Sequence, residues 1–142
     1  MLVRCLYASR AKLPLTPSLL DGLLAQCRRN NPRRGVTGLL CFTSDTFVQV
    51  LEGGRDQVCD LLANILRDER HHSVRLLSYD EIIERRFGNW TMGQVSIASI
   101  NPSLLLKYSE KAELDPFSGS GQAVMALLLE LLATGAITAR TG

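Results

Sequence analysis

The order of apolar and polar positions predicts strands and helices that alternate along most of the chain. Runs rich in β-branched and aromatic residues predict strands, whereas apolar residues that recur every three to four positions predict helices. We expect strands at residues 2–8, 35–42, 46–52, 74–83 and 90–97. The first helix should follow Thr16 as its N-cap, with Pro17 at its first position, and end near Asn31-Pro32. A second apolar stripe predicts a helix from about 56 to 68.

The resulting order, βαββαββ, predicts an α+β fold of the ferredoxin-like kind. Such a fold has a mixed five-stranded sheet with both helices on one face. A short helix from about 101 to 113 and a longer helix at 120–136 follow. Because the longer helix is apolar around most of its circumference, we expect it to cover the other sheet face, or in part to form a subunit interface. We therefore divide the chain into an α+β domain, residues 1–98, and a C-terminal helical extension, residues 99–142.

Composition indicates a cytoplasmic protein and gives no sign of nucleic-acid or membrane binding. The chain has 142 residues and a net charge of +2, which predicts no strong preference for nucleic acid or membranes. Its four cysteines form no CxxC pair, which favours free thiols in the reducing cytoplasm. The apolar stretch 123–137 contains Glu130 and is shorter than the roughly 20 residues that a membrane span requires.

Enzymatic and metal-binding signatures are absent from the sequence. It contains neither a glycine-rich phosphate loop nor an HExxH zinc motif. His71 and His72 are adjacent, a spacing that does not suit a metal pair, so we expect no metal. Glu52 and Asp56 lie where a strand ends and a helix begins, and carboxylates there commonly interact with the helix dipole.

Gln49 is an amide within an apolar strand. By the two-residue period of a strand it shares a face with Phe47 and Leu51, so we expect its side chain to be buried. An unpaired buried amide costs roughly 1–3 kcal/mol. A hydrogen-bonding partner for Gln49 is therefore expected.

Six motifs in sequence order resemble those of one known family over about residues 2–97. They are Tyr7-Ala8-Ser9-Arg10, Asn30-Asn31, Gly35-Val36-Thr37-Gly38-Leu39-Leu40, Phe47-Val48-Gln49-Val50-Leu51-Glu52-Gly53, Asp68-Glu69-Arg70-His71 and Arg86-Phe87-Gly88-Asn89-Trp90-Thr91-Met92-Gly93. Together they resemble the BLUF domain, a blue-light sensor that uses FAD. The remaining residues resemble the C-terminal helical extension of short BLUF proteins, which have no fused enzyme.

The resemblance implies that FAD is bound non-covalently between the first two helices, and that FMN or riboflavin can take its place. Apolar side chains would pack on the flavin ring, an asparagine would bind its polar edge, and charged groups would lie near the ribityl chain and phosphates. The cofactor-binding set implied in this way is Ser9, Leu23, Asn30, Asn31, Phe47, Gln49, Ile65, Asp68, Arg70 and His71.

The resemblance also implies a photochemical role for Tyr7 and Gln49. Light would drive electron transfer from Tyr7 and proton movement by way of Gln49, whose amide then rotates or tautomerises. Hydrogen bonds to flavin C4=O and N5 would change, which shifts the absorption to the red. Trp90 and Met92 share strand parity, so either is expected beside Gln49, with a core role as the alternative.

The leading interpretation is a photoreceptor without enzymatic turnover that signals to a separate protein and forms a homo-oligomer, most simply a dimer. One alternative is a small acylphosphatase-like hydrolase that uses Arg10 and Asn31, although the loop after the first strand has no glycines to bind phosphate. The other is a dimeric interaction module built on the apolar C-terminal helix.

Overall fold

The computed structural model describes residues 1–134. Within these residues, strands and helices follow the predicted order, and all five strands lie before residue 97. The elements are β1 (Leu2–Ala11), α1 (Pro17–Arg34), β2 (Thr37–Phe42), β3 (Thr46–Gly54), α2 (Arg55–Arg67), β4 (His71–Ile82), β5 (Gly93–Ser96), a 3-10 turn (Ile97–Ser99), α3 (Pro102–Tyr108) and α4 (Gly121–Thr134).

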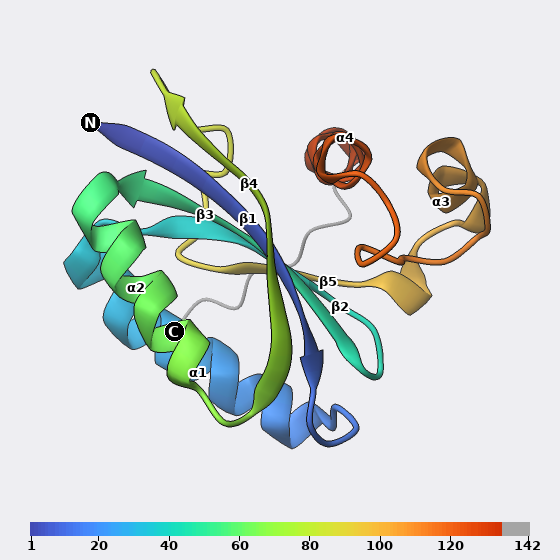
Figure 1. The fold of residues 1–142 in the computed structure, drawn as a ribbon, viewed down its shortest axis with the longest axis horizontal. Coiled ribbons are helices and arrows are strands. Elements are labelled where there is room, and N and C mark those ends of the chain that lie inside the picture. Colours follow the sequence, from blue (N-terminus) through green and yellow to red (C-terminus); the bar gives the residue numbers. More distant parts are fainter. Residues whose placement is uncertain (135–142) are drawn as a thin grey trace.

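The sheet has the mixed topology that was predicted. Its strand order is β4-β1-β3-β2-β5, with β2 and β5 parallel and the other neighbours antiparallel. Helices α1 and α2 lie on one face, whereas α3 and α4 lie on the other (Figure 1). The fold class is therefore confirmed.

Two apolar cores separate the three layers. Side chains alternate along β1, so that Val3, Cys5 and Tyr7 face α1 and α2, whereas Leu6 and Ala8 face α4. The core between the sheet and α4 contains four buried residues of this helix: Val124, Leu127, Leu128 and Leu131. The apolar helix thus covers the sheet face that α1 and α2 leave bare, although the last two residues predicted for it lie outside the described part of the chain.

Helix α1 continues to Arg34, so the predicted end near Asn31-Pro32 is wrong. Pro32 is accommodated in the last turn, and the helix ends at Gly35, which adopts the left-handed conformation with φ of 66°. Gly35 caps the C-terminus of the helix, because its backbone N–H donates to the carbonyls of Asn31 and Pro32. Asn31 consequently lies inside the helix and not after it.

The predictions for the last strand and for α3 also need correction. Strand β5 spans only Gly93–Ser96, because Trp90 and Met92 lie in a connection that is held by hydrogen bonds from other elements and not by a strand ladder. Trp90 and Met92 therefore lie outside the strand, and the prediction that they share one of its faces is wrong. Helix α3 ends at Tyr108 and not near residue 113, because the chain becomes extended at Ser109.

Within residues 1–134, no helix has the length and apolar character needed to cross a membrane.

Candidate functional site

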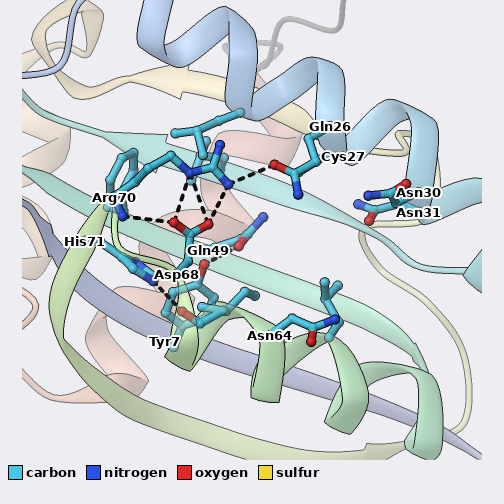
Figure 2. Close-up of a pocket in the computed structure, with 15 residues that line it drawn as sticks. Tyr7, Gln26, Cys27, Asn30, Asn31, Gln49, Asn64, Asp68, Arg70 and His71 are labelled. Atoms are coloured by element: carbon cyan, nitrogen blue, oxygen red, sulfur yellow. Dashed lines mark hydrogen bonds and ion pairs between the residues drawn. The ribbon is translucent and has the colours of Figure 1, made fainter.

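A pocket opens between α1, α2 and the sheet (Figure 2). Apolar side chains from three elements form its walls: Leu23 from α1, Ile65 from α2 and Phe47 from β3. Polar side chains lie at its floor and at its ends. The complete lining is Tyr7, Leu23, Gln26, Cys27, Asn30, Asn31, Leu40, Phe47, Gln49, Leu61, Asn64, Ile65, Asp68, Arg70 and His71.

Tyr7 and Gln49 meet at the floor of the pocket because they are directly opposite in the antiparallel β1–β3 ladder. Their side chains are 4% and 6% exposed, and the Tyr7 hydroxyl donates a hydrogen bond to Gln49 Oε1. Burial of the phenol raises the pKa of Tyr7 well above its ordinary value, so the hydroxyl is protonated at neutral pH. The amide that was expected to be buried is therefore buried, and a phenol satisfies its oxygen.

The other end of the Gln49 amide contacts Met92. Gln49 Nε2 donates to Met92 Sδ at 3.3 Å, and Met92 is 2% exposed. Trp90 is half-buried on the same connection, where its carbonyl accepts from the backbone N–H of Gly38 at 3.2 Å. The structure therefore brings Met92, and not the Trp90 ring, into hydrogen-bonding contact with Gln49.

Asn30 and Asn31 line the pocket from the last turns of α1. Asn31 is 2% exposed, and its Nδ2 donates to the carbonyl of Thr91 at 3.0 Å. This bond ties the pocket wall to the residue before Met92.

A charged cluster lies at the opposite end of the pocket, just after α2. Arg70 Nε donates to both carboxylate oxygens of Asp68, at 3.0 and 3.1 Å, and Arg70 Nη2 donates to Gln26 Oε1 on α1 at 2.8 Å. Hydrogen bonds from Arg70 lower the pKa of Asp68, and the same contact raises the pKa of Arg70. As Figure 2 shows, Arg70 connects the end of α2 to α1 across the pocket.

His71 links β1 to the end of α2 beside this cluster. Its Nε2 lies 2.6 Å from the Ile65 carbonyl and its Nδ1 lies 2.8 Å from Ser9 Oγ. Because a carbonyl only accepts, Nε2 carries a proton, and in the neutral ring Nδ1 accepts from the Ser9 hydroxyl. Phe47 packs edge-on against the imidazole, with ring centroids 6.4 Å apart. Ser9 is thus fully buried behind His71 and does not line the pocket itself.

Five lining residues were not predicted from the sequence: Gln26, Cys27, Leu40, Leu61 and Asn64. Leu61 belongs to the apolar stripe that includes Ile65, one turn later, so the helical period could have identified it. Gln26 and Asn64 carry no such signal, because a polar residue on a helix is ordinarily solvated. Cys27 is a half-buried thiol whose pKa is raised by burial.

The residues required by the hydrolase alternative lie on opposite sides of the sheet. The Arg10 guanidinium is 4.0 Å from the centroid of the Phe117 ring, and Phe117 packs against the core beneath α4. Asn31 belongs to α1 and lines the pocket on the other face of the sheet. The structure therefore gives the hydrolase interpretation no support.

The pocket is chemically suited to a flavin. Apolar walls from two helices and a strand can sandwich a planar aromatic ring, and buried amides from Asn31 and Gln49 can satisfy its polar edge. The arginine near the mouth suits a phosphate-bearing chain that leaves the pocket. The donors and acceptors present thus fit FAD.

Comparisons with known proteins agree with this geometry. The chain is 32% identical over 87 residues to the photoactivated adenylate cyclase subunit beta of Euglena gracilis, a match that covers 61% of this chain but only 10% of the cyclase. The dark-state structure of the BLUF protein BlrB superposes with a TM-score of 0.80 at 28% identity, covering 94% of this chain and 96% of BlrB. The photo-activated state of BlsA gives a TM-score of 0.80 at 29% identity, covering 100% and 99% of the two chains. The sequence profile of the BLUF family matches residues 2–93. The chain therefore belongs to the BLUF family, the sensors of blue light using FAD.

Proposed function

We propose that this chain is a blue-light receptor whose light-responsive groups are Tyr7, Gln49 and Met92. The observation that carries the proposal is the buried hydrogen-bonded series from the Tyr7 hydroxyl through the Gln49 amide to the Met92 sulfur at the pocket floor. A glutamine amide has two acceptor sites and two N–H donors. One of each is used within this series, which leaves one of each for a ligand in the pocket.

Bound flavin supplies the absorption of blue light and the acceptance of an electron. Leu23, Ile65 and Phe47 hold the ring, and Asn31, with Asn30 beside it, binds its polar edge. Asp68, Arg70 and His71 would bind the ribityl chain and phosphates. Ser9 would contribute indirectly, because its hydroxyl holds the His71 ring. FMN and riboflavin share the ring and can replace FAD.

The protein's part in the photochemistry begins at Tyr7. With flavin bound, the Tyr7 phenol would be the electron donor, and its proton would move to Gln49 Oε1, with which the hydroxyl is already hydrogen-bonded. Both the electron and the proton would then return to Tyr7, which would leave the Gln49 amide rotated or tautomerised. Rotation would present a different atom to the pocket and to Met92, whereas tautomerisation would keep both atoms in place and change which of them carries a proton.

Met92 carries the change outward. A rotated amide turns its oxygen toward a sulfur that can only accept, so the bond from Gln49 Nε2 to Met92 Sδ is lost. Because β5 begins at Gly93, movement of Met92 reaches the sheet edge directly. Residues 1–98 serve as the flavin-binding sensor, and residues 99–142 as the helical cap through which the signal leaves.

The chain acts without enzymatic turnover and passes its signal to a separate protein, as a homodimer in the cytoplasm and without direct contact to nucleic acid. All four cysteines are free thiols, as expected in a reducing compartment. The larger cyclase relative contains a segment like this chain as about a tenth of its length. That arrangement is consistent with a sensor module that controls a different effector.

Purification tests the proposal simply. The protein is expected to be yellow, or to become yellow when FAD is added, and to keep the flavin on gel filtration. A colourless protein that fails to bind added FAD would contradict the proposed function.

A further inference from the structure

Glu52 is a fully buried carboxylate at the end of β3, three positions beyond Gln49. It is 0% exposed and faces away from the flavin pocket, beside Phe87 in the core beneath α4. Its Oε2 accepts from Arg4 Nε at 2.8 Å and from the backbone N–H of Arg86 at 3.1 Å. Its Oε1 accepts from the backbone N–H of Phe87 at 2.5 Å. A buried carboxylate requires such partners, and two of the three belong to the backbone that follows β4.

Those two donors lie in the connecting loop, which we define as residues 83–92 between β4 and β5. Arg85 also anchors this part of the loop, here through a loop side chain that donates to groups outside the loop. Its Nη1 donates to Thr37 Oγ1 at 2.8 Å and to the Glu52 carbonyl at 3.2 Å, and its Nη2 donates to the Gly35 carbonyl at 2.7 Å. The first half of the connecting loop is therefore fixed to the sheet by the side chain of Arg85 and by the side chain and carbonyl of Glu52.

The second half of the loop reaches the light-responsive groups. The Thr91 carbonyl accepts from Asn31 Nδ2, and the Met92 sulfur accepts from Gln49 Nε2. Only residues 88–91 separate the backbone held by Glu52 from Met92. Loops without regular structure keep one conformation only where specific contacts hold them. The anchor at residues 85–87 therefore holds the sulfur in place together with the hydrogen bonds to the carbonyls of Trp90 and Thr91.

We propose that Glu52 is a positioning residue for the light response: by fixing residues 85–87 it holds Met92 as the acceptor of the Gln49 amide and thereby sets the lifetime of the light-induced state. This inference rests on the proposed function. Glu52 does not touch the pocket, so its influence passes through Met92. The Glu52 carboxylate thus positions the loop in addition to forming an ion pair with Arg4.

The test compares Glu52→Gln with the wild-type protein in the flavin-loaded full chain. The amide keeps the size of the side chain but presents an N–H group to donors that need an acceptor, so the hold on residues 85–87 weakens. We expect the flavin content and the dark absorption spectrum to be unchanged, and the rate of dark recovery to change on the order of threefold or more, in the same direction as in Met92→Leu. Glu84→Gln, the same substitution at an exposed site of the same loop, should recover at the wild-type rate.

A double-variant cycle separates positioning from a general structural role. If Glu52 acts through Met92, the effect of Glu52→Gln should shrink to less than about 1.5-fold when Met92 is already leucine. An unchanged recovery rate in Glu52→Gln, or an equal change in both backgrounds, would overturn the inference. Should Glu52→Gln fail to fold, Arg85→Gln loosens the same half of the loop and is interpreted by the same criteria. A wild-type protein without any light-induced shift would instead refute the proposed function.

Discussion

Tyr7→Phe is the smallest change that breaks the hydrogen-bonded series at the pocket floor. It removes one oxygen and keeps the aromatic ring in the core. Gln49 Oε1, on a side chain that is 6% exposed, then loses its phenolic donor. A buried acceptor left unpaired costs about 1–3 kcal/mol of the free energy of unfolding. With a urea dependence of about 2 kcal/mol per molar, the unfolding midpoint of the flavin-free protein should fall by about 1 M.

The optical consequence should be complete and not partial. Phenylalanine has no phenolic proton and is a far weaker electron donor, so the variant should bind flavin and show no red shift in the light-minus-dark absorption spectrum. Tyr108→Phe is the matched control, because that hydroxyl bonds to Glu130 Oε1 at 3.1 Å on the C-terminal cap. The control should shift normally. A reversible red shift in Tyr7→Phe would refute the role of Tyr7.

Three further predictions concern the mouth, the cap and the sheet. The pKa of Asp68 is lowered in the folded protein by hydrogen bonds from Arg70, so its carboxylate contributes stability above the unfolded-state pKa of about 3.9, and that contribution is lost as the pH falls through the folded-state pKa. Asp68→Asn should therefore be less stable than wild type at pH 7, by up to about 1 kcal/mol for this partly exposed pair, and the urea midpoints should converge as the pH falls below the folded-state pKa. Truncation after residue 98 removes the four buried apolar side chains of α4, roughly 2 kcal/mol each, so the fragment should aggregate on gel filtration; a soluble monomer would count against the cap. In Gly38→Ala the new methyl group would lie 2.0 Å from a β3 carbonyl, which should lower the melting temperature sharply, whereas Gly22→Ala, with open space around it, should not.

The sheet and its two helical layers could be predicted from the chain because each depends on local periodicity. Alternation in β3 correctly placed Gln49 in a buried position. The apolar residues around most of the circumference of α4 correctly predicted that this helix covers the bare sheet face. These features depend on which side of an element is apolar, and that information lies within a few residues. The order of the elements then restricted the topology.

The connecting loop could not be predicted in the same way. Its conformation is decided by donors from distant elements, such as Gly38 for the Trp90 carbonyl and Asn31 for the Thr91 carbonyl. A strand pattern read through these residues therefore placed Trp90 and Met92 in a ladder that does not exist. Glu52 illustrates the same limit, because its position before a helix suggested a dipole contact, whereas the fold buries it against backbone donors more than thirty residues away.

Pocket residues that come from facing helices also escaped sequence reasoning. Gln26 and Asn64 acquire their place in the pocket only because α1 and α2 lie over the same part of the sheet. Neither residue type nor spacing within one helix contains that information. Such side chains become candidates only when the packing of two elements is known.

The central claim is that the Gln49 amide changes its hydrogen bonds when the bound flavin absorbs light. Its most direct test is the absorption spectrum of wild-type protein and of Gln49→Leu, each loaded with FAD, before and after blue illumination. Both should contain flavin, and only the wild type should shift to the red and return in the dark. A wild type that does not shift, or a Gln49→Leu variant that shifts and recovers as the wild type does, would contradict the account.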